Sequence, residues 1–285
     1  MMPPLTLYTF AASQSSEKIR WALDASGLPY RERRLTPFLH YGAYPHRSAG
    51  LGTSLPVLEA DGEMIEDSTR ILEWLETHRA PFPLIPQDPV LRTAVMRSEA
   101  RFDHIGPHVV RCMYATLLDD GDLVQRLWSV DAGFIQAAVL RAAFPVLSRL
   151  FRRGLGLDAP ALLKHSQGVI VRALDELDRM AEDGRPYLVG EALTVADITA
   201  AAHLAPLACP DEHPVFSDIE YRDAIAPLVS RWQARPALAW VRELYRLHRR
   251  VRPLRVLTQA PSAAQAFRSS RPRRIRPAGR FLAGR

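Results

Sequence analysis

Residues 5–23 read LTLYTFAASQSSEKIRWAL and combine two hydrophobic patterns in one short stretch. The first part, Leu5–Phe10, alternates between β-favouring residues, which is typical of a strand. After it, Ser13 can cap the start of a helix that Gly27 ends. The apolar side of that helix is formed by Ile19, Ala22 and Leu23. The stretch therefore predicts a strand followed directly by an amphipathic helix.

The residues that follow predict three more strands and a second helix. Strands are expected over 29–35, 55–59 and 64–65, separated by a loop over 36–54 and a hairpin turn over 60–63. Pro56 stands near the start of the middle one. Asp67 and Ser68 can cap the helix that comes next. The expected order over residues 1–80 is β-α-β-β-β-α, an α/β domain.

The rest of the chain is predicted to be helical. The prolines within residues 80–86 remove backbone donors, so we expect a linker over 81–89 rather than a helix. Apolar residues at helical spacing predict helices over 91–109, 134–151, 170–181, 194–205 and 238–248. Residues 90–248 therefore form an all-α second domain.

The helix expected from residue 194 has a complete start signal. Thr194 and Asp197 have the spacing of a capping box, in which each side chain accepts a backbone N–H of the other residue. Leu193 and Ile198 flank it as a hydrophobic staple. We assign this motif a structural role only.

Length and composition exclude several classes of protein. The chain has 285 residues, of which 47% are hydrophobic and 24% charged, as in ordinary globular proteins of two domains. Its 2 cysteines are too few for a disulfide framework. We expect no membrane span, because no uncharged apolar run reaches about 18 residues, and no secretory signal. The chain is expected in the cytoplasm.

The net charge of +6 is unevenly distributed. Residues 249–285 contain eleven arginines and no acidic residue, so they carry +11 and residues 1–248 carry −5. This basic tail has no hydrophobic periodicity and is expected to be disordered. Any attraction of the tail for polyanions would be weak and salt-dependent.

Four motifs, in this order, resemble those of the soluble glutathione S-transferase family over roughly residues 4–248. They are Leu7–Phe10 followed by Ser13-x-x-Ser16-x-Lys-Ile-Arg20, then Leu55-Pro56-Val57-Leu58, then Glu66-Asp67-Ser68, and finally Tyr187–Gly190 with Leu193–Ile198. The resemblance implies a thioredoxin-like N-terminal domain and an all-helical C-terminal domain. It also implies glutathione as co-substrate, no metal, and a homodimer.

Ser13 stands where the family carries its catalytic serine or cysteine. A thiol is mostly protonated at neutral pH, so the reaction needs a hydroxyl donor and a helix N-terminus that stabilise the thiolate. Ser13 can supply both, although it can also serve as a plain helix cap. Ser16, one turn further on, is expected to act mainly as a cap. Because serines occupy both positions, disulfide exchange at this site is disfavoured.

Leu55 and Pro56 resemble the segment that holds the cysteinyl part of glutathione. The resemblance implies a cis peptide bond at Pro56, which turns the backbone N–H and C=O of Leu55 toward an extended ligand. A strand-edge proline in the trans form is the alternative.

Asp67 and Ser68 resemble the residues that bind the γ-glutamyl end. A helix start can bind a carboxylate through its N–H groups, and Asp67 can approach the ammonium. A plain N-cap is the alternative. The chain departs from the family at Arg70, where a small residue is usual, and lacks the usual Asn-Pro before Leu55. The anchor for the glycyl carboxylate is thus unassigned, with His40 and Arg47 as candidates.

His108, Arg111 and Tyr114 fall in the region that lines the acceptor-substrate pocket in the family, and we expect them to contact substrate. His104, His108 and Cys112 share one helix face, but Gly106-Pro107 interrupts that helix and no fourth metal ligand is evident. We therefore expect no metal site and treat the three as a polar helix face.

These observations predict a glutathione transferase-like enzyme in which glutathione attacks a small electrophile. A glutathione-dependent isomerase or dehalogenase would use the same activated thiol. A non-catalytic binding protein that keeps the fold is the third possibility, favoured by Arg70, the missing Asn-Pro and the basic tail.

Overall fold

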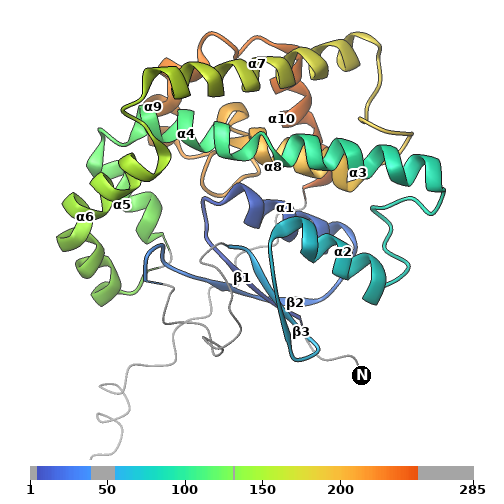
Figure 1. Cartoon of the computed structure of the whole chain (residues 1–285), viewed down its shortest axis with the longest axis horizontal. Coiled ribbons are helices and arrows are strands. Elements are labelled where there is room, and N and C mark those ends of the chain that lie inside the picture. Colours follow the sequence, from blue (N-terminus) through green and yellow to red (C-terminus); the bar gives the residue numbers. More distant parts are fainter. Residues whose placement is uncertain (1–4, 40–54, 131, 250–285) are drawn as a thin grey trace, which may run out of the picture. The chain divides into compact units, whose positions relative to one another are not determined.

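The computed structural model describes residues 5–39, 55–130 and 132–249. The backbone divides into a unit of residues 1–250 and a second unit, 251–285. Figure 1 shows the described part of the first unit in colour. His40 and Arg47, the candidates for the glycyl-carboxylate anchor, lie outside the described residues.

The N-terminal part has the predicted thioredoxin-like architecture. Its elements are β1 (Leu5–Thr9), α1 (Gln14–Ala25), β2 (Tyr30–Arg34), β3 (Val57–Ala60), β4 (Glu63–Glu66) and α2 (Ser68–His78). The sheet order is β2-β1-β3-β4, with β1 parallel to β2 and antiparallel to β3. The β3–β4 hairpin turns at Asp61 and Gly62, whose φ values of 53° and 87° suit the tight two-residue turn that the sequence predicts.

The C-terminal part is all-helical, as predicted. It contains α3 (Pro89–Asp103), α4 (Gly106–Leu117), α5 (Gly121–Ser129), α6 (Phe134–Leu155), α7 (Pro160–Glu182), α8 (Val195–Ala208), α9 (Ile219–Val229) and α10 (Pro236–His248). The short helices α5 and α9 are not among those that the sequence predicts.

The single helix expected over 91–109 is wrong, because the structure divides it into α3 and α4. Helix α3 ends at Asp103, and α4 begins at Gly106. A Cβ atom on Gly106 would collide with the ring of His203 from α8. The missing Cβ of Gly106 therefore lets the His203 ring of α8 lie close to the backbone at the start of α4.

The linker is non-helical, as its prolines predict, but it is not a loose connection. Phe82, Leu84 and Ile85 are buried in the core, and the carbonyl of Leu84 accepts the N–H of Val195 at 3.0 Å. The linker therefore fixes the start of α8 against the N-terminal part.

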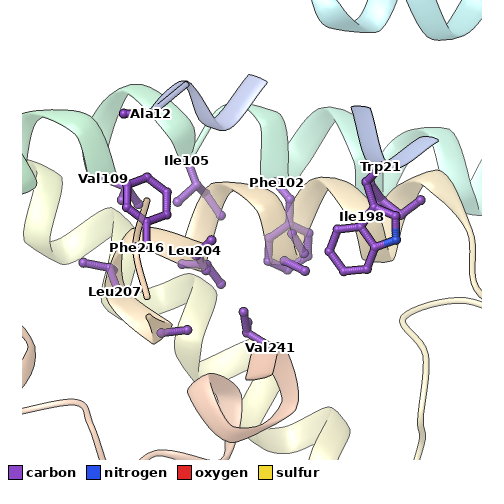
Figure 2. Close-up of a cluster of buried hydrophobic side chains, with 14 of the residues drawn as sticks. Ala12, Trp21, Phe102, Ile105, Val109, Ile198, Leu204, Leu207, Phe216 and Val241 are labelled. Atoms are coloured by element: carbon purple, nitrogen blue, oxygen red, sulfur yellow. The ribbon is translucent and has the colours of Figure 1, made fainter. Parts of the chain in front are cut away.

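One continuous core joins the two parts. All residues of α8 are buried, as expected for a helix that is apolar on every side. Figure 2 shows Ile198 of α8 beside Trp21 of α1 and Phe102 of α3, with Val241 of α10 nearby. The capping box at the start of α8 is confirmed, because Asp197 accepts the N–H of Thr194 at 2.8 Å.

The predicted start of the basic tail at residue 249 needs a correction. The side chain of Arg249 is only 9% exposed and forms ion pairs with Glu17 at 2.6 Å and with Asp24 at 2.8 Å. Both acids belong to α1. Arg249 is thus part of the folded unit, a role that the run of arginines in the sequence conceals.

Candidate functional site

Ser13 lies in the short connection between β1 and α1 and caps the helix. Its φ and ψ of −81° and 122° are extended, and its Oγ accepts the N–H of Ser16 at 3.1 Å. The side chain is half-buried. No acceptor among the described residues takes its hydroxyl hydrogen. Ser13 therefore combines the cap that the sequence predicts with a donor that is still available.

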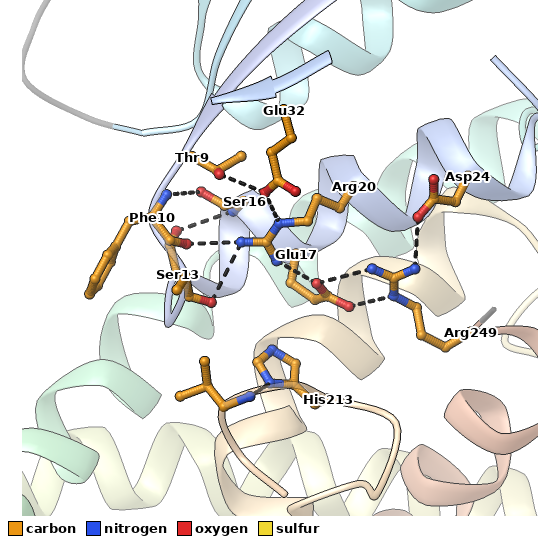
Figure 3. A network of polar contacts seen from close by, with 12 residues as sticks. Thr9, Phe10, Ser13, Ser16, Glu17, Arg20, Asp24, Glu32, His213 and Arg249 are labelled. Atoms are coloured by element: carbon orange, nitrogen blue, oxygen red, sulfur yellow. Dashed lines mark hydrogen bonds and ion pairs between the residues drawn. The ribbon is translucent and has the colours of Figure 1, made fainter. Parts of the chain in front are cut away.

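Ser16 has a different role from the expected one. It is fully buried, and its Oγ accepts the N–H of Phe10 at 3.3 Å. The hydroxyl thus ties α1 to the end of β1 and does not cap the helix. Figure 3 shows Ser13 and Ser16 on the two sides of this connection.

Below the connection, a buried ionic network holds α1 in place (Figure 3). Arg20 donates to the carbonyl of Phe10 at 2.9 Å, to Glu17 at 2.5 Å and to Glu32 at 2.6 Å. Burial by itself would raise the pKa of Glu17, but Arg249 and Arg20 outweigh burial and lower that pKa to about 2. Glu17 is therefore a permanent anion at neutral pH, and the network fixes the backbone that carries Ser13.

His213 borders this network as a neutral side chain. Its Nδ1 accepts the N–H groups of Val215 and Phe216 at 3.2 and 3.1 Å. Burial lowers the pKa of His213 to about 3, although Glu17 acts in the opposite direction. The sequence offered no signal that His213 lies near Glu17, because these two residues are far apart in the chain.

The peptide bond between Leu55 and Pro56 is cis, as the resemblance implies. Pro56 is buried and Leu55 half-buried. The contact of Leu55 with a cysteinyl group stays a prediction.

Asp67 and Ser68 lie at the start of α2. Asp67 is the N-cap, with a φ of 79°, and its Oδ1 accepts the N–H groups of Thr69 and Arg70 at 2.9 and 3.1 Å. Ser68 is buried, and its Oγ accepts a hydrogen bond from Lys18 at 3.1 Å. The hydroxyl that was expected to bind glutathione is therefore already engaged by a lysine.

Lys18, to which the sequence motifs assign no role, forms the centre of a buried charge cluster. Its ammonium lies 2.5 Å from Glu99 and 2.7 Å from Asp103, and both Lys18 and Glu99 are wholly buried. It also donates to Thr69 at 3.3 Å. One signal could have revealed it: Lys18 precedes Ala22 by four residues, and it therefore lies on the apolar side of the helix.

Asp103 connects this cluster to α8. Its Oδ1 lies 3.3 Å from Nε2 of His203 and 3.5 Å from Oγ of Ser68. Burial would raise the pKa of Asp103, but the contacts with His203 and Lys18 hold that pKa far below its usual range. The carboxylate remains about one-third exposed. An ionised, partly accessible carboxylate thus lies beside the start of α2.

The residues expected to contact an acceptor substrate are engaged with neighbouring helices. Nδ1 of His108 lies 3.0 Å from Oγ of Ser166, to which Arg111 donates at 2.8 Å. Trp128 donates to the hydroxyl of Tyr114 at 3.0 Å. Contact of His108, Arg111 and Tyr114 with substrate stays a prediction.

His104, His108 and Cys112, the polar helix face, do not form a metal site. Among the described residues, no group of three His, Cys, Asp or Glu side chains could hold a metal ion. The rings of His104 and His108 lie 5.3 Å apart across the helix break. Burial raises the pKa of the Cys112 thiol to about 11, so this cysteine is a packing residue at neutral pH.

Comparison with known proteins identifies the family. Residues 7–83 match the model for the glutathione S-transferase N-terminal domain, and residues 160–249 match the model for the C-terminal domain. Together the two matches span more than half of the chain.

The chain belongs to the glutathione S-transferase family.

Solved structures of family members share the fold. A glutathione S-transferase from Methylobacillus flagellatus with glutathione bound has a TM-score of 0.55 at 22% identity, over 84% of this chain and 93% of that one. One from Methylobacterium radiotolerans, in complex with glutathione sulfonate, has a TM-score of 0.51 at 24% identity, over 83% and 93%. The β-etherase LigF from Sphingobium sp. strain SYK-6 has a TM-score of 0.53 at 20% identity, over 85% and 99%.

One curated relative matches over a shorter region. It is a probable maleylacetoacetate isomerase from Caenorhabditis elegans, 27% identical over 86 residues. The match covers 30% of this chain and 40% of the relative.

Proposed function

We propose that this family member binds glutathione and that Ser13 holds the glutathione thiol as a thiolate. The observation that carries the proposal is the geometry of Ser13, which accepts the Ser16 N–H and keeps its own hydrogen available. The N-terminal N–H groups of α1 add positive potential at the same place. A negative sulfur beside Ser13 would receive both interactions.

We propose that the γ-glutamyl end binds at the start of α2. This part of glutathione carries both a carboxylate and an ammonium. The N–H groups of Thr69 and Arg70 already bond Asp67, so the backbone N–H of Ser68 is the donor that suits the carboxylate. We keep Asp67, which is exposed at this helix start, as one partner of the ammonium. The cluster of Lys18, Glu99 and Asp103 has one cation and two anions, and its accessible member, Asp103, suits the ammonium as a second partner. Ser68 then acts by joining the helix start to this cluster through Lys18.

The proposed reaction is attack of the thiolate on a small electrophile. An isomerase reaction is the second candidate, because the curated relative is named a probable isomerase and such an enzyme would use the same thiolate. The two candidates share every residue assigned above and differ only in the fate of the glutathione adduct. A binding protein without catalysis would keep the α2 site and lack the thiolate.

The test is titration of the bound thiol. Glutathione is mixed with the full-length protein, and thiolate absorbance is followed against pH in the wild type, in Ser13→Ala and in Ser15→Ala. Ser15 is a half-buried serine in the same helical turn. We expect the bound thiol to ionise below its free pKa in the wild type and Ser15→Ala. In Ser13→Ala the lowering should be smaller, because only the helix N-terminus remains.

Three outcomes separate the candidates. Equal titration in wild type and Ser13→Ala would remove Ser13 from the mechanism. Binding of glutathione without ionisation in the wild type would support the binding protein. Absence of binding by calorimetry would reject the glutathione site altogether.

We also propose a cytoplasmic homodimer, on the basis of family membership. Sedimentation velocity of the full-length chain measures the oligomeric state directly, and a monomer at micromolar concentration would contradict the dimer.

A further inference from the structure

Helix α6 is apolar on both of its long sides. One side faces the protein, where Leu140 is buried and Phe144, Leu147 and Phe151 pack against the core. A helix that is apolar all round is normally buried all round. Only 6% of the most apolar stretch of α6 is buried, however, so its other side has no protein cover among the described residues.

The outward side forms one continuous stripe. Ile135, Val139, Val146 and Leu150 are exposed by 78%, 47%, 59% and 61%. Together with exposed Ala142, their spacing of three and four residues places them on one line along the helix. Single exposed apolar residues are common, whereas a contiguous apolar stripe marks an interaction surface.

The charges of α6 are all positive. The helix contains Arg141, Arg149, Arg152 and Arg153 and no acidic residue. Arg152 pairs with Asp119 and Asp158. The other three arginines of α6 are exposed. Within residues 5–39, 55–130 and 132–249, no carboxylate pairs with them. At 100° per residue, Arg149 and Arg153 lie beside the apolar stripe.

The inward side fixes the orientation of this stripe. Phe151 lies 4.6 Å from Tyr114 of α4 and 5.4 Å from Trp128 of α5, measured between ring centroids. α6 packs chiefly on these two helices and lies at the edge of the helical part (Figure 1). Both α5 and α6 fall between the regions that match the family models. Packing of the inward side on α4 and α5 therefore holds the stripe outward.

By length and composition, α6 would also be long and apolar enough to cross a membrane. Two observations favour a position along the membrane surface instead. Arg141 and Arg149 lie in the middle of the helix, where a charge is costly at the centre of a bilayer. The inward side is packed against α4 and α5 and is not available to lipid.

We propose that the outward face of α6, formed by the apolar stripe together with Arg149 and Arg153, docks on an anionic lipid surface. Lipid headgroups supply negative charge for the arginines, and the acyl boundary accepts the apolar side chains. A second copy of α6 fits less well, because two wholly cationic helices would face each other. The proposal does not depend on the glutathione site.

The test is co-sedimentation of the full-length protein with vesicles. One set contains phosphatidylcholine alone, and the other contains about 30% phosphatidylserine, which gives a surface potential that attracts basic residues. We expect binding to the second set, at least about tenfold stronger than to the first and weakened by salt. The double variant Arg149→Gln/Arg153→Gln should bind the anionic vesicles at least about tenfold more weakly, because each arginine contributes about fivefold.

The decisive variant is Ile135→Glu/Val146→Glu, which should lose binding. Its matched control is Val90→Glu/Ile219→Glu, because these residues are exposed by 77% and 67% on α3 and α9 and give the same change in charge. The control should bind like the wild type. All four substitutions are on the surface, so the melting temperatures should agree and exclude loss of fold.

Every other outcome overturns the proposal. If the wild type shows no preference for anionic vesicles, α6 is not a lipid-binding face. If Ile135→Glu/Val146→Glu binds like the wild type, another part of the chain, such as the basic tail, is responsible. If this variant instead converts a dimer to a monomer while the wild type ignores vesicles, a second copy covers the stripe.

Discussion

Of the two lysines in the chain, Lys18 is wholly buried between two carboxylates, whereas Lys164 is exposed. At the residue scale, this difference gives a direct test. Lys18→Met leaves Glu99 buried and without its cation, which typically costs about 3–5 kcal/mol of unfolding free energy. Lys164→Met should stay within about 0.5 kcal/mol of the wild type. Urea unfolding measures both, and equal values would show that the buried cluster contributes nothing to stability.

A second prediction at this scale concerns His213 and pH. The folded pKa of about 3 lies below the ordinary value of 6.5, so the unfolded chain binds one more proton between these two pH values. Stability should therefore fall as pH drops below about 6.5, by up to about 1.4 kcal/mol for each pH unit. His213→Asn keeps an acceptor for the backbone and cannot titrate, so its stability should depend less on pH. An unchanged slope in urea unfolding between pH 6 and about 4 would contradict this.

At the scale of elements, the break between α3 and α4 is tied to the position of α8. Gly106→Ala should destabilise the protein by about 1–3 kcal/mol, because the new methyl group meets the ring of His203, which is held beside Asp103. The matched control is Gly154→Ala in α6, where a Cβ meets nothing within 4 Å. That change should be neutral or stabilising by up to about 1 kcal/mol, since alanine favours helix. Thermal unfolding compares them, and equal melting temperatures would show that the contact with His203 is not limiting.

At the scale of the whole molecule, the boundary between folded unit and tail decides what truncation does. A chain that ends at residue 250 should melt like the full-length protein. Arg249→Ala in the full-length chain should lose about 3 kcal/mol, because Glu17 and Asp24 lose a buried partner. Arg252→Ala is the control and should change nothing. Retention on heparin should fall in the truncated chain and hardly at all in Arg249→Ala, because the remaining arginines of the tail supply the charge.

The sequence by itself determined the local elements and the fold class. Alternating apolar residues predicted β1, and helical spacing predicted α1. Turn residues placed the β3–β4 hairpin, and Thr194 with Asp197 placed the start of α8. Each of these signals acts between residues that are close in the chain. Ser13 could be found for the same reason, since a cap is a local interaction.

Only the tertiary structure decided the partners of the charged residues. Lys18 meets Glu99 and Arg249 meets Glu17 across long separations in sequence. Helical spacing places Lys18 on the apolar side of α1, but it does not indicate which acidic residues lie opposite. The same holds for α6. Its composition shows an apolar helix with arginines, but packing on α4 and α5 decides which apolar side is covered and which faces outward. For a helix that is apolar on two sides, the choice between them is made by the assembled core, because the sequence pattern of the helix is the same for both.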